Sequence, residues 1–86
     1  MEVFERIKCI NELLGQSGYG FLANIIVEEL LAGGTDGERL ILVCGRLLAM
    51  KEKYPDVYRL IGHEANGVIK YCRDIGMSPI PNYSIP

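Results

Sequence analysis

The only histidine of this chain stands in a context that partly matches a helical zinc-protease motif. Glu64 follows His63, but that motif needs a second histidine four residues after the first, and Gly67 occupies that position. A single histidine without a partner at this spacing has no preorganised metal site. We therefore expect His63 to be an ordinary residue on a helix surface.

The three cysteines, Cys9, Cys44 and Cys72, form an odd and widely spaced set. No pair is separated by two residues, the spacing that preorganises zinc ligands, and the set is more typical of free buried thiols in a reducing cytoplasm than of a disulfide framework. A nucleophilic Cys72 would need His63 as its base, but nine residues of continuous helix place the two on opposite faces. The sequence thus predicts no metal, no cofactor and no catalytic residue. A small enzyme or ligand pocket remains a lesser alternative, for which the groups to consider are Tyr58, His63, Tyr71 and Cys72.

Two glycine-containing turns could in principle bind phosphate or DNA. The loop at residues 15–20 has no lysine after it in the way that a phosphate-binding loop requires, and we expect no strand before it. In a helix-turn-helix, the second helix would present Asp36 and Glu38 to DNA phosphates, which repel them. The net charge of −2 and the pI near 5.3 give no basic surface. We expect no nucleic-acid partner.

Three basic residues lie seven positions apart in the middle of the chain: Arg39, Arg46 and Lys53. On a helix they form one stripe, with Leu42 and Ala49 between them, which places charged ends over apolar side-chain stems. The stripe is either a solvated face or an interface for an acidic partner, in which Arg46 is the expected anchor because arginine is frequent at binding hot spots.

Apolar spacing of three and four residues predicts the first two helices. The N-terminus enters the first helix directly, its apolar face begins at Val3, and Gly15 stops it. The second covers residues 21–32 and is apolar apart from Asn24, Glu28 and Glu29, so we expect it to be the most buried helix, with both glutamates solvated.

Capping signals define the next two helices. Thr35 and Glu38 form a capping box in which Glu38 reaches back to the Thr35 N–H, and the third helix runs from there to Lys53. Pro55 opens the fourth helix, which Gly76 ends. Glycine weakens helices, so a kink or a split is expected near residues 66–67, Asn66 and Gly67.

These elements predict an all-α fold: a compact antiparallel four-helix bundle at residues 1–76, followed by an extended C-terminal tail at residues 77–86. Pro79 and Pro81 exclude helix from the tail. The expected core consists of Phe4, Ile7, Leu14, Leu22, Ile26, Leu30, Leu40, Val43, Leu47, Val57, Ile61 and Val68. The tail's Ile80, Tyr83 and Ile85 either pack on the bundle or contact a partner.

Composition favours binding as the function. The chain is 49% hydrophobic over 86 residues, and a domain of this size leaves apolar surface uncovered. Residues 1–38 hold two basic and seven acidic residues, a net −5, whereas residues 39–86 hold seven basic and four acidic residues, a net +3. The N-terminus carries no secretion signal and no apolar run is long enough to span a bilayer, so we expect a cytoplasmic protein without a membrane partner.

The chain resembles bacterial immunity proteins and phage-encoded inhibitors in its size, its acidic helical character and the turn between Leu30 and Glu38. That resemblance implies a non-enzymatic protein-binding module that occludes a partner protein. The alternative is a homo-oligomeric structural or regulatory protein that binds a second copy of itself. The expected partner-binding residues are Arg39, Leu42, Arg46, Lys53, Ile80 and Tyr83.

Overall fold

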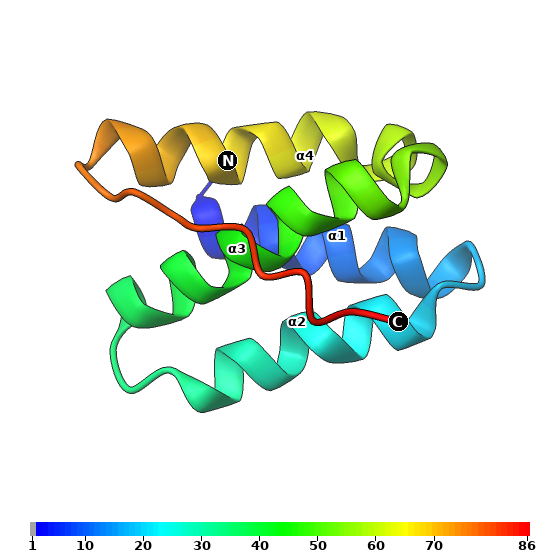
Figure 1. Cartoon of the computed structure of the whole chain (residues 1–86), viewed down its shortest axis with the longest axis horizontal. Coiled ribbons are helices and arrows are strands. Elements are labelled where there is room, and N and C mark those ends of the chain that lie inside the picture. The colour runs from blue at the N-terminus through cyan, green and yellow to red at the C-terminus, as the bar shows by residue number, and fades with distance from the viewer. Residues whose placement is uncertain (1) are drawn as a thin grey trace.

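The computed structural model describes residues 2–86, which form four α-helices and an extended tail (Figure 1). The helices are α1 (Val3–Gln16), α2 (Gly20–Ala32), α3 (Asp36–Lys53) and α4 (Pro55–Asp74). Each helix packs against two others, in the order α1, α2, α3, α4 and back to α1, and helices adjacent in sequence run in opposite directions. The predicted four-helix bundle is confirmed. None of these helices is both long and apolar enough to cross a membrane.

The helix boundaries follow local capping chemistry. Thr35 caps α3 as predicted, because its Oγ1 accepts a hydrogen bond from the Glu38 N–H at 3.1 Å. Glu38 reaches one residue further than expected and accepts from the Gly34 N–H at 3.3 Å. At α1 the Glu2 carboxylate caps the helix by accepting from two backbone amides, which the sequence analysis had not foreseen.

Two boundary details differ from expectation. Gly15 does not stop α1, which continues to Gln16; the left-handed residue of that turn is Gly18, with φ of 85°. Of the predicted kink or split near Asn66 and Gly67, the split does not occur, since α4 is continuous from Pro55 to Asp74, and the kink stays a prediction. Gly67 serves packing instead, since a Cβ there would lie 2.9 Å from the guanidinium of Arg6 on α1.

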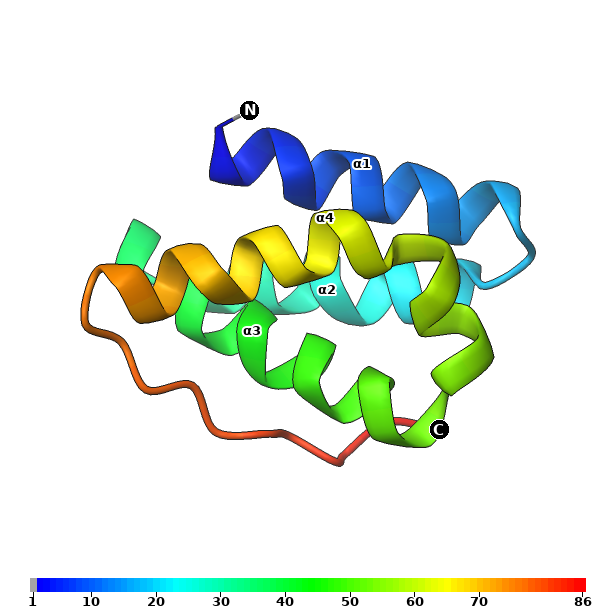
Figure 2. The same cartoon turned by 90° about the horizontal axis from the view of Figure 1, so that it is seen from above.

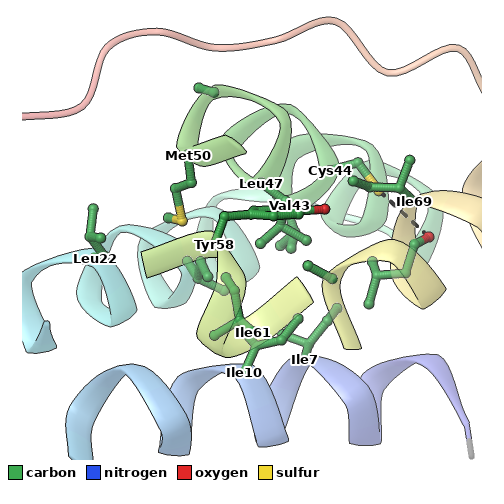
Figure 3. Packing of buried hydrophobic residues seen from close by; sticks show 14 of the residues in the cluster. Ile7, Ile10, Leu22, Val43, Cys44, Leu47, Met50, Tyr58, Ile61 and Ile69 are labelled. Carbon is green, nitrogen blue, oxygen red and sulfur yellow. Dashed lines mark hydrogen bonds between the residues drawn. The ribbon is translucent and has the colours of Figure 1, made fainter. Parts of the chain in front are cut away.

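The core lies at the centre of the ring of helices (Figure 3). Ten of the twelve predicted core residues are buried, and the two exceptions, Phe4 and Leu30, are only partly buried. The buried apolar residues outside the expected core list are Val3, Ile10, Cys44, Ala49, Met50, Tyr58, Ala65, Ile69, Cys72 and Ile85. Cys44 and Cys72 are buried thiols as predicted, whereas Cys9 is only partly buried.

The expectation that α2 is the most buried helix is wrong. Only Leu22, Ile26 and Glu29 of this helix are buried, whereas α3 and α4 each bury seven residues. In a four-membered ring each helix contacts two neighbours, so the remainder of its surface faces outward whatever its composition. The apolar Val27 and Leu31 of α2 are therefore exposed.

The tail runs back along α3 as an extended segment, on the opposite side of the bundle from α1 (Figure 2). Gly76, with φ of 88°, turns the chain after α4. The Asn82 N–H then donates to the Gly45 carbonyl at 2.9 Å, and Ile85 is buried against the core. The tail approaches α3 so closely that a Cβ on Gly45 would lie 2.7 Å from the carbonyl oxygen of Ile80.

We predict that Gly45→Ala destabilises the protein by about 1 to 3 kcal/mol, because the methyl group collides with backbone rather than with a flexible side chain. Amide hydrogen exchange should show lost protection at Asn82 and Ile85. Gly62→Ala is the matched control: Gly62 also lies inside a helix, but an added Cβ there meets only the Tyr58 ring, at an ordinary 3.9 Å. It should stabilise α4 by up to about 1 kcal/mol. Equal gains from both substitutions, measured by urea unfolding, would contradict the close approach of the tail.

Candidate functional site

The basic stripe of α3 is largely engaged by the protein's own chain. Arg39 lies at the turn between α2 and α3, where its Nε donates to the Leu30 carbonyl at 3.0 Å and its guanidinium pairs with Asp36 at 3.0 Å. These contacts hold the end of α2 against the start of α3. Asp36, one of the two acidic residues considered for DNA contact, is thus the ion-pair partner of Arg39.

Arg46 occupies the centre of the stripe and is nearly buried, with 13% of its side chain exposed. Its guanidinium lies 3.6 Å from the Glu29 carboxylate of α2, which is 12% exposed, and it donates a hydrogen bond to the Ser84 carbonyl of the tail. The expectation that Glu29 is solvated is therefore wrong. A buried guanidinium needs anionic and polar partners, and here they come from α2 and the tail.

Lys53 and Tyr54 hold the last residues of the tail. The Lys53 ammonium donates to the carbonyl oxygens of Ile85 at 2.8 Å and Tyr83 at 3.3 Å, and the Tyr54 hydroxyl donates to a carbonyl oxygen of Pro86. An extended peptide has unpaired carbonyls along its length, and the donors of α3 satisfy them. The face defined by Arg46, Lys53 and Gly45 is thus a binding surface for an extended segment, and the tail occupies it.

The remaining residues of the predicted partner-binding set lie along the tail. Leu42 and Ile80 line a small hollow of about 190 Å³ between α3 and the tail. The Ile80 side chain is 80% exposed, and Tyr83 is half-exposed beside Glu52, whose carboxylate raises the pKa of the Tyr83 hydroxyl. The structure therefore brings five of the six predicted residues to the face where the tail meets α3, while Arg39 lies apart at the helix turn.

The histidine and the cysteine considered as a catalytic pair are not brought together. His63 is 89% exposed, whereas Cys72 is buried on the other face of α4, as the helical spacing predicts. Tyr58 is buried, and its hydroxyl lies 2.6 Å from the Asn66 side-chain oxygen, to which it donates a hydrogen bond. Within residues 2–86 no three His, Cys, Asp or Glu side chains are grouped closely enough to hold a metal ion.

A second surface, absent from the sequence-based expectation, lies between α1 and α2. It is an open groove of about 470 Å³ whose lining is mostly apolar. Its residues are Phe4, Ile7, Lys8, Asn11, Glu12 and Leu30. Phe4 and Leu30, the two predicted core residues that remain partly exposed, belong to this groove.

One polar atom of a groove residue has no hydrogen-bond partner within residues 2–86. Asn11 Oδ1 is buried, and an unsatisfied buried acceptor costs free energy, about 1 to 3 kcal/mol in mutational data. Because the atom is closed off from solvent, this cost is carried by the fold, and the atom is not an open acceptor position in the groove.

The groove continues into the exposed apolar face of α2. Val27 lies three residues before Leu30 and four before Leu31, so the three side chains are neighbours on the helix surface. Leu31 is 81% exposed. This α1–α2 surface, defined by Phe4, Asn11, Val27, Leu30 and Leu31, combines a concave shape with exposed apolar side chains.

We predict that Arg46→Met lowers the free energy of unfolding by about 2 to 3 kcal/mol, because it leaves the Glu29 carboxylate nearly buried without its counter-ion. Combining it with Glu29→Leu should recover at least half of this loss, since both charges are then absent. Arg59→Met is the control: Arg59 pairs with Asp56 at 3.3 Å, but both side chains are more than four-fifths exposed. Its effect should stay below about 0.5 kcal/mol. A loss from Arg46→Met no larger than from Arg59→Met would refute the role of the buried pair.

Comparison with protein-family models, with curated proteins and with solved structures gave no match, so the function has to be argued from the geometry of this chain.

Proposed function

We propose that this protein is a non-enzymatic binding module that occludes a partner protein, and that the α1–α2 surface makes the contact. The observation that carries the proposal is the mostly apolar groove between α1 and α2, which continues into the exposed Leu31. Apolar surface of this kind, concave and next to polar groups, is typical of protein interaction sites.

The shape and charge of this surface favour an amphipathic helix as the bound element. A groove between two packed helices accepts the apolar stripe of a third helix. The exposed charged residues on α1 and α2 are Glu5, Glu12 and Glu28 against a single Lys8. The complementary partner helix therefore carries basic residues beside its apolar stripe, and added salt should weaken the complex.

Inhibition by occlusion is the form of this function that we infer, because the α1–α2 surface offers a partner apolar contact area. Residues 2–86 contain no group of three His, Cys, Asp or Glu side chains that could hold a metal ion. Bacterial immunity-type and phage-type inhibitors act by occlusion, and a cytoplasmic location is the setting we propose for the three thiols.

The alternative is that the α1–α2 surface binds a second copy of this chain. The exposed Val27 and Leu31 and the opposite net charges of the two chain halves are compatible with self-association. Light scattering at tens of micromolar separates the two proposals. A monomer counts against self-association, whereas a dimer that Leu31→Glu converts to monomer replaces the hetero-complex proposal.

Two matched variants, used as baits in affinity capture, test which surface binds the partner protein. Leu31 and Ile80 are both large aliphatic residues with about four-fifths of the side chain exposed, so Leu31→Glu and Ile80→Glu should each change stability by less than about 0.5 kcal/mol. We predict that wild type and Ile80→Glu capture the same partner from cells of the source organism, while Leu31→Glu weakens capture at least about tenfold, which corresponds to about 1.4 kcal/mol.

The opposite pattern has an equally clear meaning. If Ile80→Glu loses the partner and Leu31→Glu keeps it, the face where the tail meets α3 is the binding surface. If both variants keep it, the α1–α2 proposal is wrong.

A further inference from the structure

Two buried thiols from different helices face each other in the core. Cys44 of α3 and Cys72 of α4 are both fully buried, and their sulfur atoms lie 2.7 Å apart. Figure 3 shows the Cys44 side chain pointing from α3 toward α4. Cys44 Sγ also lies 3.9 Å from the Val68 carbonyl oxygen, and Cys72 Sγ lies 3.9 Å from the Leu40 carbonyl oxygen.

The separation of the two sulfurs lies between a covalent bond and ordinary packing. A disulfide has an S–S distance of about 2.05 Å, and non-bonded heavy atoms pack at about 3.5 to 4 Å. A shift of about 0.7 Å in the sulfur–sulfur distance separates the observed contact from a disulfide bond. Since 28 positions separate the two residues, it is the packing of α3 on α4 that brings them together.

We propose that Cys44 and Cys72 are a latent redox pair that forms a disulfide between α3 and α4 on exposure to a peroxide. Hydrogen peroxide oxidises one thiol to a sulfenic acid and is reduced to water. The second sulfur then attacks the sulfenic sulfur, the S–S bond forms, and the sulfenic oxygen leaves as a second water with the proton of that thiol. Two thiols and one peroxide thus give one disulfide and two waters.

The surroundings of the pair make its reaction slow in the folded protein. Burial, and for Cys44 also the neighbouring Cys72 thiol, raises the pKa of both groups, so that both stay protonated at neutral pH. Oxidation therefore needs a transient opening between α3 and α4 that admits peroxide. Cys9 lies on α1 and is partly exposed, outside this pair.

The tail is attached beside both cysteines. The Met77 N–H donates to the Cys72 carbonyl at 2.9 Å, and the Asn82 N–H donates to the carbonyl of Gly45, the residue after Cys44. A disulfide between Cys44 and Cys72 would fix the distance between the two backbone carbonyls, of Cys72 and Gly45, that hold the tail. Oxidation therefore stabilises the docked tail together with the α3–α4 contact.

The test starts from the fully reduced chain treated with hydrogen peroxide, in buffer and in urea just below the unfolding transition. Alkylation under denaturing conditions and mass spectrometry then count the free thiols. We expect an intact mass lower by about 2 Da before alkylation, one alkylated cysteine in place of three, and a peptide that links Cys44 to Cys72, formed faster in urea. The linked protein should melt about 10 °C higher than the reduced one, and dithiothreitol should reverse the shift.

Substitutions provide the controls. Cys9→Ser should leave both the linked peptide and the melting shift intact, and Cys44→Ser should abolish both. Should Cys44→Ser fail to fold, the thiol count and the linked peptide of wild type still decide the question. Three alkylatable thiols after peroxide in both buffers, a link that involves Cys9, or sulfinic acid on Cys44 or Cys72 without a link would each overturn the proposal.

Discussion

The arrangement of α2, α3 and the tail depends on the contacts of one nearly buried guanidinium, that of Arg46. A cation in this position has to be neutralised and hydrogen-bonded, and its partners are the Glu29 carboxylate on α2 and the Ser84 carbonyl in the tail. The same residue therefore sets how α2 lies on α3 and where the tail ends. Its Nε is buried without a hydrogen-bond partner among residues 2–86, so this junction is held by charge pairing and packing rather than by a complete hydrogen-bond network.

The internal use of the basic stripe changes which surface is available to a partner. Arg39, Arg46 and Lys53 donate to carbonyl oxygens of Leu30, Ser84 and Ile85, respectively. An external acidic partner would have to compete with these bonds. The α1–α2 surface requires no such exchange, because the apolar side chains of Val27 and Leu31 already face outward.

Local sequence signals predicted the helices well and their environments less well. Thr35, Pro55 and the three- and four-residue spacing gave correct helix starts and most of the core, because caps and amphipathic periods are properties of the helix itself. The burial of Glu29 could have been predicted from the sequence, because this residue lies three positions after Ile26 and seven after Leu22, on the buried stripe of α2. The close approaches of the tail to Gly45 and of Arg6 to Gly67 could not have been predicted, since each depends on segments that are distant in sequence.

The separation of the two faces has a consequence for how the molecule would work. The tail covers α3 on the side of the bundle opposite α1, so a helix bound at the α1–α2 surface would not have to displace it. The stability of the α3–α4 half depends instead on the buried Ile85, on the tail contact at Gly45 and on the packing of the Cys44–Cys72 pair. The exposed apolar face of α2 belongs to the other half, where a partner can gain from burying what the fold leaves uncovered. Stability and partner binding can use different faces of this small bundle because each helix in a four-membered ring contacts only two neighbours.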